Sequence, residues 1–288
     1  MKKLRIPLII LLILAGAGFF LYPKLQVYLS QHNASVAIAG YSASVSGQDD
    51  QTIADELKAA QDYNSALSGQ DIRDPFAPGS GAVLDSNYQN LLNVNGTMGY
   101  LVIPKINVNL PIYHGTSDAT LQKGVGHLEG TSLPVGGAGT HAVLTGHTGL
   151  PSARLFTDLT ELAEGDVFYV HVLSEVLAYQ VDQIKVVEPT DTGDLQLTPG
   201  QDYVTLMTCT PYGINDHRLL VRGTRIAYDP QTEQNDIAKA PVLTTENRIL
   251  LRAGIITAAV MLALIVIALL IRRGKNRKNK YQPKHLKK

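Results

Sequence analysis

A single cysteine, Cys209, is the residue whose chemistry most constrains this sequence. It ends an apolar, strand-like run (YVTLMTC) and precedes a loop rich in turn-forming residues (TPYGIND). One cysteine cannot form an intramolecular disulfide, so its side chain either fills a small apolar space or acts as a nucleophile. A side chain at the end of a strand is held by that strand while the loop admits substrate, which is a common arrangement for catalysis.

Two further residue types could act on a thiol at this position. Arg218 opens the next strand-like run, and His147 follows another such run in LTGHTGLP. A free thiol with a pKa of ~8.5 is mostly protonated at neutral pH, and nearby positive charge raises its thiolate fraction. Histidine can exchange the proton, and arginine offers a permanent charge to a substrate carbonyl or its oxyanion. Arg222 shares a strand face with Arg218 and remains an alternative, and Arg225 is also close in sequence.

The residues around these positions predict a mainly β domain. Short runs rich in Val, Ile, Leu and Tyr are separated by Gly, Pro, Asn and Asp, which is typical of a closed barrel or a sandwich. Strands are expected at 98–103, 108–113, 141–145, 167–172, 177–187, 203–208 and 219–228. Helical stretches are expected at 51–67, 84–92, 119–123 and 153–162. Asp50 is the expected N-cap of the first helix, and a Gly- and Pro-rich loop follows that helix.

The distribution of charge indicates that the chain occupies two compartments. The formal net charge is +0, which argues against a nucleic-acid-binding protein. Three basic residues precede residue 6, nine lie in 272–288, and all 25 acidic residues lie between these ends. The middle of the chain is therefore strongly acidic and the ends are basic.

Two uncharged apolar runs, 6–22 and 253–271, separate these regions, and each approaches the ~20 residues that a membrane-spanning helix needs. Because basic residues flank both runs on their outer sides, we expect both termini to be cytoplasmic and the acidic middle to be extracellular. A cleaved signal peptide is the alternative for the first run. Phe19, Phe20 and Tyr22 occupy the place of a small-residue cleavage site, which favours an uncleaved anchor.

Two segments resemble the signature of the sortase family. TLMTCTPYGINDHRLLVRGTR is similar to its TLxTC strand, loop and arginine strand, and LTGHTGLPSARLFTDL is similar to its histidine region. The resemblance covers roughly residues 97–228. It implies a sortase-like closed β-barrel with short helices. It also implies that His147 is the catalytic histidine, Cys209 the nucleophile and Arg218, the first arginine after the loop, the catalytic arginine.

The sequence further resembles class C, the pilin-polymerising sortases. TPYGINDHRLLVRG and the second apolar run are similar to that subgroup, and Asp74-Pro75-Phe76 resembles its lid motif. The resemblance implies that Asp74 and Phe76 lie over the active site. An ordinary Asp-Pro turn is the alternative.

Together these patterns divide the chain into six regions. They are a transmembrane anchor (1–23), an extracellular helical segment with a lid loop at about 68–81 (24–82), a catalytic β-barrel (83–228), a linker (229–250), a second transmembrane helix (251–271) and a basic cytoplasmic tail (272–288).

The expected activity is transpeptidation without a metal or organic cofactor. The resemblance implies that the partners are pilin subunits with an LPXTG-like sorting signal and an acceptor lysine, beside the lipid bilayer itself. A housekeeping or other-class sortase that anchors proteins to the cell wall is one alternative. A membrane-anchored β-rich adhesin or scaffold without enzymatic activity is another.

Overall fold

The computed structural model describes residues 2–67, 72–77 and 85–240 of the chain. Its helices are α1 (Lys2–Ser46), α2 (Asp50–Ala66), α3 (Ser86–Asn90), α4 (Asp118–Leu121) and α5 (Pro230–Lys239), with 3-10 turns η1 (Pro104–Ile106), η2 (Leu159–Glu161) and η3 (Gly193–Leu195). No helix within the described part of the chain is both long and apolar enough to cross a bilayer. The predicted span at 251–271 and the basic tail at 272–288 lie outside the described residues.

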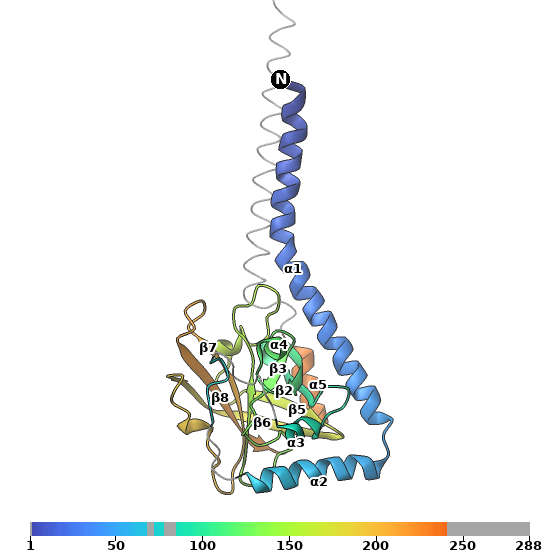
Figure 1. Ribbon diagram of the computed structural model, residues 1–288, viewed down its shortest axis with the longest axis vertical. Coiled ribbons are helices and arrows are strands. Elements are labelled where there is room, and N and C mark those ends of the chain that lie inside the picture. The colour runs from blue at the N-terminus through green and yellow to red at the C-terminus, as the bar shows by residue number, and fades with distance from the viewer. Residues whose placement is uncertain (1, 68–71, 78–84, 241–288) are drawn as a thin grey trace, which may run out of the picture. The chain divides into compact units, whose positions relative to one another are not determined.

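A closed β-barrel forms the centre of the fold (Figure 1). Its strands are β1 (Gly99–Ile103), β2 (Val108–His114), β3 (Val125–His127), β4 (Thr140–Thr145), β5 (Val167–Val172), β6 (Glu175–Val187), β7 (Asp202–Thr210) and β8 (His217–Ile226). They follow the order β1-β2-β3-β4-β7-β8-β6-β5 around the barrel. The β2–β3 and β4–β7 pairs are parallel and the other pairs are antiparallel, so the predicted closed barrel is confirmed.

Strand β7 shows why the apolar runs in the sequence have no clear polar alternation. Leu206 faces the core inside the barrel, whereas Met207, one residue later, belongs to a second apolar cluster. Successive side chains point to opposite faces of a strand, so a strand that is covered on both faces must be apolar throughout. The outer cover is supplied in part by Ile72, from the segment between α2 and α3. Residues 72–77 are called the lid segment below.

The barrel interior is closely packed around aromatic side chains. Phe168 and Tyr179 are fully buried and their rings stack 5.6 Å apart. A Cβ atom at Gly223 would lie 2.6 Å from the Phe168 ring, so this position of β8 accepts only glycine without a shift. The bulky rings of β5 and β6 therefore determine the residue that β8 can carry opposite them.

Helix α2 delivers the chain to the lid segment. Asp49, not the expected Asp50, caps its N-terminus by accepting a hydrogen bond from the Thr52 amide. Near the other end of α2, the buried side chain of Asn64 donates to the Leu133 carbonyl and accepts from the Leu133 amide. These paired hydrogen bonds fix the C-terminal end of α2 to the barrel, because an unpaired buried amide would be costly.

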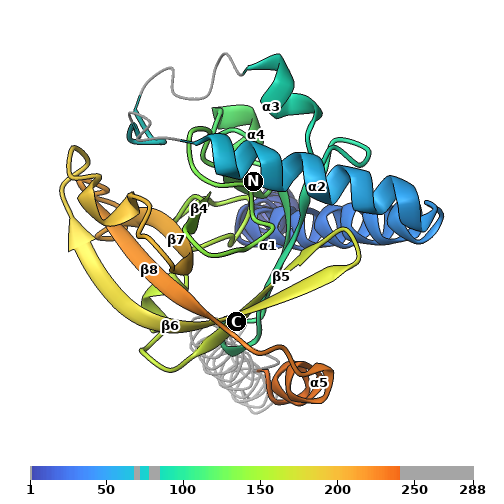
Figure 2. The ribbon, with the colours of Figure 1, turned by 90° about the horizontal axis from the view of Figure 1, so that it is seen from below.

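The polar stretch after β8, which was predicted to be a linker, contains helix α5. Asp229 caps it, and Glu233 is buried between His171, 2.7 Å away, and the Tyr228 hydroxyl. Tyr169 donates a further hydrogen bond to Asp236. In Figure 2, α5 lies on the side of the barrel opposite α2, α3 and α4. Its polar residues make specific contacts with β5, which composition alone does not distinguish from a solvated linker.

Two further local predictions differ from the structure. Strand β3 was not predicted, because three residues are too few to show a periodic pattern. The expected helix at 153–162 is a series of turns that contains only η2. Leu155 there has a positive φ of 40°, which a right-handed helix cannot include.

Candidate active site

The strand ends bring Cys209 and Arg218 directly opposite each other. Cys209 is the penultimate residue of β7, and Arg218 is the second residue of β8. The two residues are register partners in the antiparallel β7–β8 pair. Side chains of directly opposed residues project from the same face of a sheet, so the thiol and the guanidinium share one surface.

His147 reaches the same rim through the parallel pairing of β4 with β7. Thr145 of β4 is level with Met207, so His147 and Cys209 each lie two residues beyond the same level of the sheet. The connecting residue Gly146 is held to β7 at both of its backbone groups. Its amide donates to the Met207 carbonyl (3.1 Å), and its carbonyl accepts from the Thr208 hydroxyl (2.7 Å).

Gly146 is also required by its surroundings. A Cβ atom at this position would lie 2.8 Å from the ring of Phe156, which is fully buried. Phe156 in turn donates its backbone amide to the His147 carbonyl. The histidine loop thus returns on itself and packs against the residue next to His147, which fixes the direction in which the loop leaves β4.

Arg218 is buried and makes four hydrogen bonds. Its Nε and Nη2 atoms bind the two carboxylate oxygens of Asp74, each at 2.8 Å. Its Nη1 atom donates to the backbone carbonyls of Asn215 and His217. The carbonyls orient the guanidinium from the loop side, and the bidentate carboxylate holds it from the lid side.

The other two arginines of β8 are engaged elsewhere. Arg222 lies on the strand face shared with Arg218, as expected, but it forms a bidentate pair with Asp182 and lies over the Tyr203 ring. Arg225 lies near Asp202, at 3.6 Å. Of the three arginines, the structure brings Arg218 to Cys209.

The lid segment closes over this group of residues. The centroid of the Phe76 ring lies 5.6 Å from the centroid of the His147 ring and 5.1 Å from the Arg218 Cζ atom. With Asp74 bound to Arg218, both residues of the predicted lid motif therefore contact predicted catalytic residues. The lid segment thus covers the predicted catalytic residues in this structure.

Ile72 is a third contact of the lid segment, and sequence reasoning did not single it out. It packs in the outer apolar cluster with Leu128, Val143, Leu195, Met207 and Leu220. Its signal in the sequence is an apolar residue in a polar stretch, at a spacing of two residues in Ile72, Asp74 and Phe76. In an extended segment, the Ile72 side chain would share a face with those of the motif.

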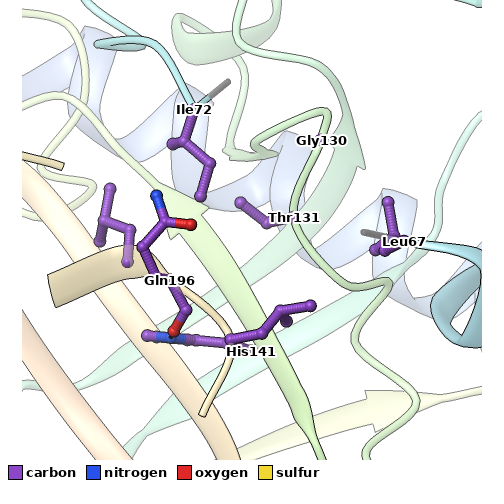
Figure 3. A pocket seen from close by; sticks show the side chains of 8 residues that line it. Leu67, Ile72, Gly130, Thr131, His141 and Gln196 are labelled. Atoms are coloured by element: carbon purple, nitrogen blue, oxygen red, sulfur yellow. The ribbon is translucent and has the colours of Figure 1, made fainter. Parts of the chain in front are cut away.

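A cavity of about 170 Å³ lies beside Ile72 (Figure 3). The side chains of Thr131, His141 and Gln196 surround it together with Ile72.

The five other histidines between residues 85 and 240 have ordinary structural partners. His127 is fully buried and binds Tyr88 and the Ser132 carbonyl, and burial lowers its pKa to about 4. Similar contacts hold His141, His114, His171 and His217. Among the residues 2–67, 72–77 and 85–240, no group of three or more His, Cys, Asp or Glu side chains could hold a metal ion.

Solved structures of similar proteins share this fold, and the similarity covers more of the chain than the barrel alone. Sortase C-1 of Streptococcus pneumoniae is 52% identical, covers 67% of this chain and 99% of its own, and has a TM-score of 0.65. Sortase C1 of Streptococcus agalactiae is 47% identical, with 69% and 99% covered and a TM-score of 0.65. The sortase domain profile matches residues 101–226.

This chain belongs to the sortase family. Among curated relatives, sortase D of Bacillus subtilis is 32% identical over 131 residues, which are 44% of this chain and 63% of that protein. Sortase A of Streptococcus agalactiae is 32% identical over 116 residues, 39% of this chain and 47% of that protein. The chain thus spans less than two thirds of the length of these curated relatives. The prediction of a sortase-family enzyme is confirmed.

The electrostatics of this sortase disfavour a reactive thiolate while the lid is closed. Burial raises the pKa of Cys209 above its usual range, the Arg218 charge opposes that rise, and Asp74 adds to it. Burial also lowers the pKa of His147, against a smaller opposing effect of Asp118. We expected nearby positive charge to favour the thiolate, but in the closed state desolvation prevails and Asp74 opposes Arg218. Both the thiol and the imidazole are therefore kept neutral.

We expect Asp74→Asn to speed alkylation of Cys209 by iodoacetamide several-fold at neutral pH. The substitution removes a negative charge that both raises the pKa of the thiol and holds the lid segment to Arg218. The pH midpoint of the alkylation rate should therefore move downward. The measurement is the rate of thiol modification, followed by mass spectrometry across a pH series.

Asp216→Asn is the matched control, because Asp216 lies in the β7–β8 loop but pairs with His217 rather than with Arg218. An alkylation rate for Asp74→Asn equal to that of the wild type, or an equal acceleration in Asp216→Asn, would show that Asp74 does not restrain the thiol.

Proposed function

We propose that this sortase is a class C, pilin-polymerising transpeptidase. The observation that carries the proposal is the group of Cys209, Arg218 and His147 on one barrel rim beneath Asp74 and Phe76. The similarity to sortase C structures from Streptococcus supports the subclass. One solved sortase C of Streptococcus pneumoniae, 49% identical, is described in terms of pilin substrate specificity.

The first half of the proposed reaction forms a thioacyl enzyme. Cys209 transfers its proton to His147 and attacks the threonine carbonyl carbon of an LPXTG-like sorting signal. A carbon–sulfur bond forms, and the negative charge on the carbonyl oxygen develops beside the Arg218 guanidinium. The threonine–glycine bond then breaks, and His147 returns the proton to the departing glycine nitrogen.

The second half transfers the acyl group to an amine. The neutral ε-amine of a lysine on the next pilin subunit attacks the thioester carbon, and His147 accepts a proton from that nitrogen. The carbon–sulfur bond breaks, and Cys209 takes the proton back from His147. The product is an isopeptide bond between two subunits, and repetition yields a covalent polymer.

This mechanism requires the lid segment to leave the rim. Arg218 donates to Asp74 through Nε and Nη2, which are the donors an oxyanion near Cys209 would need. Phe76 meanwhile covers the Arg218 and His147 side chains. We infer that the closed arrangement is a resting state that pilin binding must displace.

The proposed location is the cell membrane, with the catalytic barrel on the extracellular face. Residues 1–23 and 251–271 would span the bilayer, and both basic termini would be cytoplasmic. The support is the sequence itself, because two uncharged apolar runs are flanked by basic residues while all acidic residues lie between them.

We expect Cys209→Ala to abolish polymerisation in cells that lack other sortases. The alanine variant cannot form the thioester, so no intermediate is available for aminolysis. The readout is the ladder of covalent pilin polymers on a denaturing gel. Persistence of the ladder would refute the assignment. If pilin monomers instead become attached to the cell wall by the wild-type enzyme, the housekeeping alternative applies.

We expect Arg218→Lys to lower kcat/KM for a sorting-signal peptide by about 10²-fold, in the range found when an oxyanion donor is lost. Lysine keeps the charge but not the planar donor geometry. Arg222→Lys is the matched control, since Arg222 is bound to Asp182 and should lose little activity. Equal losses in the two variants would assign no special role to Arg218.

The topology predicts which positions an impermeant reagent reaches in intact cells. In the Cys209→Ala background, Asp62→Cys should react with a membrane-impermeant maleimide, because α2 would be extracellular and Asp62 is exposed. Lys280→Cys should react only after the cells are permeabilised. Labelling of position 280 in intact cells would contradict two spans with cytoplasmic termini.

A further inference from the structure

Helix α1 has two different faces over residues 22–45. One face packs on the barrel through the buried side chains of Ala34, Tyr41 and Val45. The Tyr41 hydroxyl donates to the Met98 carbonyl and accepts from the Leu173 amide, so the position of this face is fixed by hydrogen bonds as well as by packing. The opposite face is exposed, although it is apolar.

The exposed face forms a continuous line of residues, called the α1 seam here. Its members recur at alternating spacings of three and four residues, which is the heptad pattern of a coiled-coil seam. They are Tyr22, Leu25, Leu29, His32, Val36, Ala39 and Ala43. All seven are exposed, and Tyr22, Leu25 and Val36 have 63%, 54% and 59% of their surface accessible.

The heptad assignment agrees with the contacts of the helix. If the seam residues occupy the a and d positions, Ala34, Tyr41 and Val45 fall at f, f and c, the positions that face outward in a coiled coil. The barrel therefore covers the outward face of α1, and the seam is free to meet another helix. Seven seam positions correspond to three heptads, or about 30 Å of helix.

The charge pattern selects the kind of partner. Lys24 is the sole charged residue between Tyr22 and Ser46. A helix that lies on an anionic membrane surface carries Lys and Arg along its polar face, and this segment does not. A strongly charged protein partner would also find no complement. Two identical uncharged seams, in contrast, meet without repulsion between like charges.

We propose that the α1 seam binds the α1 seam of a second copy of this chain, in parallel and in register. His32 occupies a d position in the middle of the seam, and in an in-register pair the two His32 side chains face each other. A polar residue at one core position sets the register of a coiled coil at a cost in stability. The His32 ring also stacks with Tyr28 of its own helix, 6.4 Å away, which keeps it near the seam.

Cysteine cross-linking of the full-length chain in detergent tests this pairing. Cys209→Ala removes the native thiol, and Leu25→Cys, Leu29→Cys and Val36→Cys are then introduced one at a time. In-register seams bring like-numbered positions within disulfide reach. We expect a several-fold excess of covalent dimer over Gln31→Cys after mild oxidation, because Gln31 is exposed but lies off the seam. Equal dimer yields at all four positions would overturn the proposal.

Sedimentation of the full-length chain gives a second measurement. Leu29→Asp and Val36→Asp should shift the dimer to monomer, whereas Gln31→Asp should not, and His32→Leu should strengthen the dimer. These side chains are exposed, so each variant should keep the far-ultraviolet circular dichroism spectrum of the wild type, which excludes misfolding as the cause.

Three other results would each overturn the proposal. The first is a wild-type chain that is monomeric in detergent. The second is an intramolecular disulfide between Val36→Cys and Val260→Cys, which would place the chain's own apolar run on the seam. The third is a monomer that binds anionic vesicles through the seam.

Discussion

The parallel pairing of β4 with β7 is the constraint on which the whole site depends. Parallel neighbouring strands end at the same edge of a sheet, so the chain that connects them must return to the opposite edge before the second strand begins. Here β5 and β6 lie in the connection between β4 and β7, and they close the other side of the barrel. Because β8 runs antiparallel to β7 and begins at this edge, the residues beyond β4, at the end of β7 and at the start of β8 meet without any local sequence relationship.

The sequence predicts the members of this site better than it predicts their state. Residue type and strand-end position made Cys209 and His147 candidates, because Cys209 ends one apolar run and His147 follows another, and both runs are strands. The resemblance to the family then singled them out from the alternatives. Strand alternation alone left Arg218 and Arg222 as alternatives, and the family pattern favoured Arg218. The structure separates them, because Arg218 is the register partner of Cys209 whereas Arg222 pairs with Asp182. The neutral state of the thiol was not predictable either, because desolvation depends on what covers the site.

The missed features share a physical cause, which is that they depend on distant contacts. Strand β3 is three residues long and is defined by its neighbours on either side. Helix α5 has a polar composition, and its buried Glu233 makes sense only beside His171. Ile72 is one apolar residue in a polar stretch, and its burial is created by an apolar cluster that β4, β7 and β8 help to form. Capping, by contrast, is local, and there the prediction erred by one residue.

The attachment of the lid segment at both ends has a consequence for how the enzyme responds to its surroundings. Asn64 fixes the end of α2 to the barrel, and the Asp85 amide donates to Glu129 on the other side of the lid segment. A displaced lid therefore stays near the rim at an effective concentration of roughly millimolar order, whatever the abundance of the protein. Dilution of the protein does not weaken this intramolecular competition. A ligand at the same rim must instead outcompete the tethered segment, which raises the ligand concentration needed for half-saturation whatever the concentration of the enzyme.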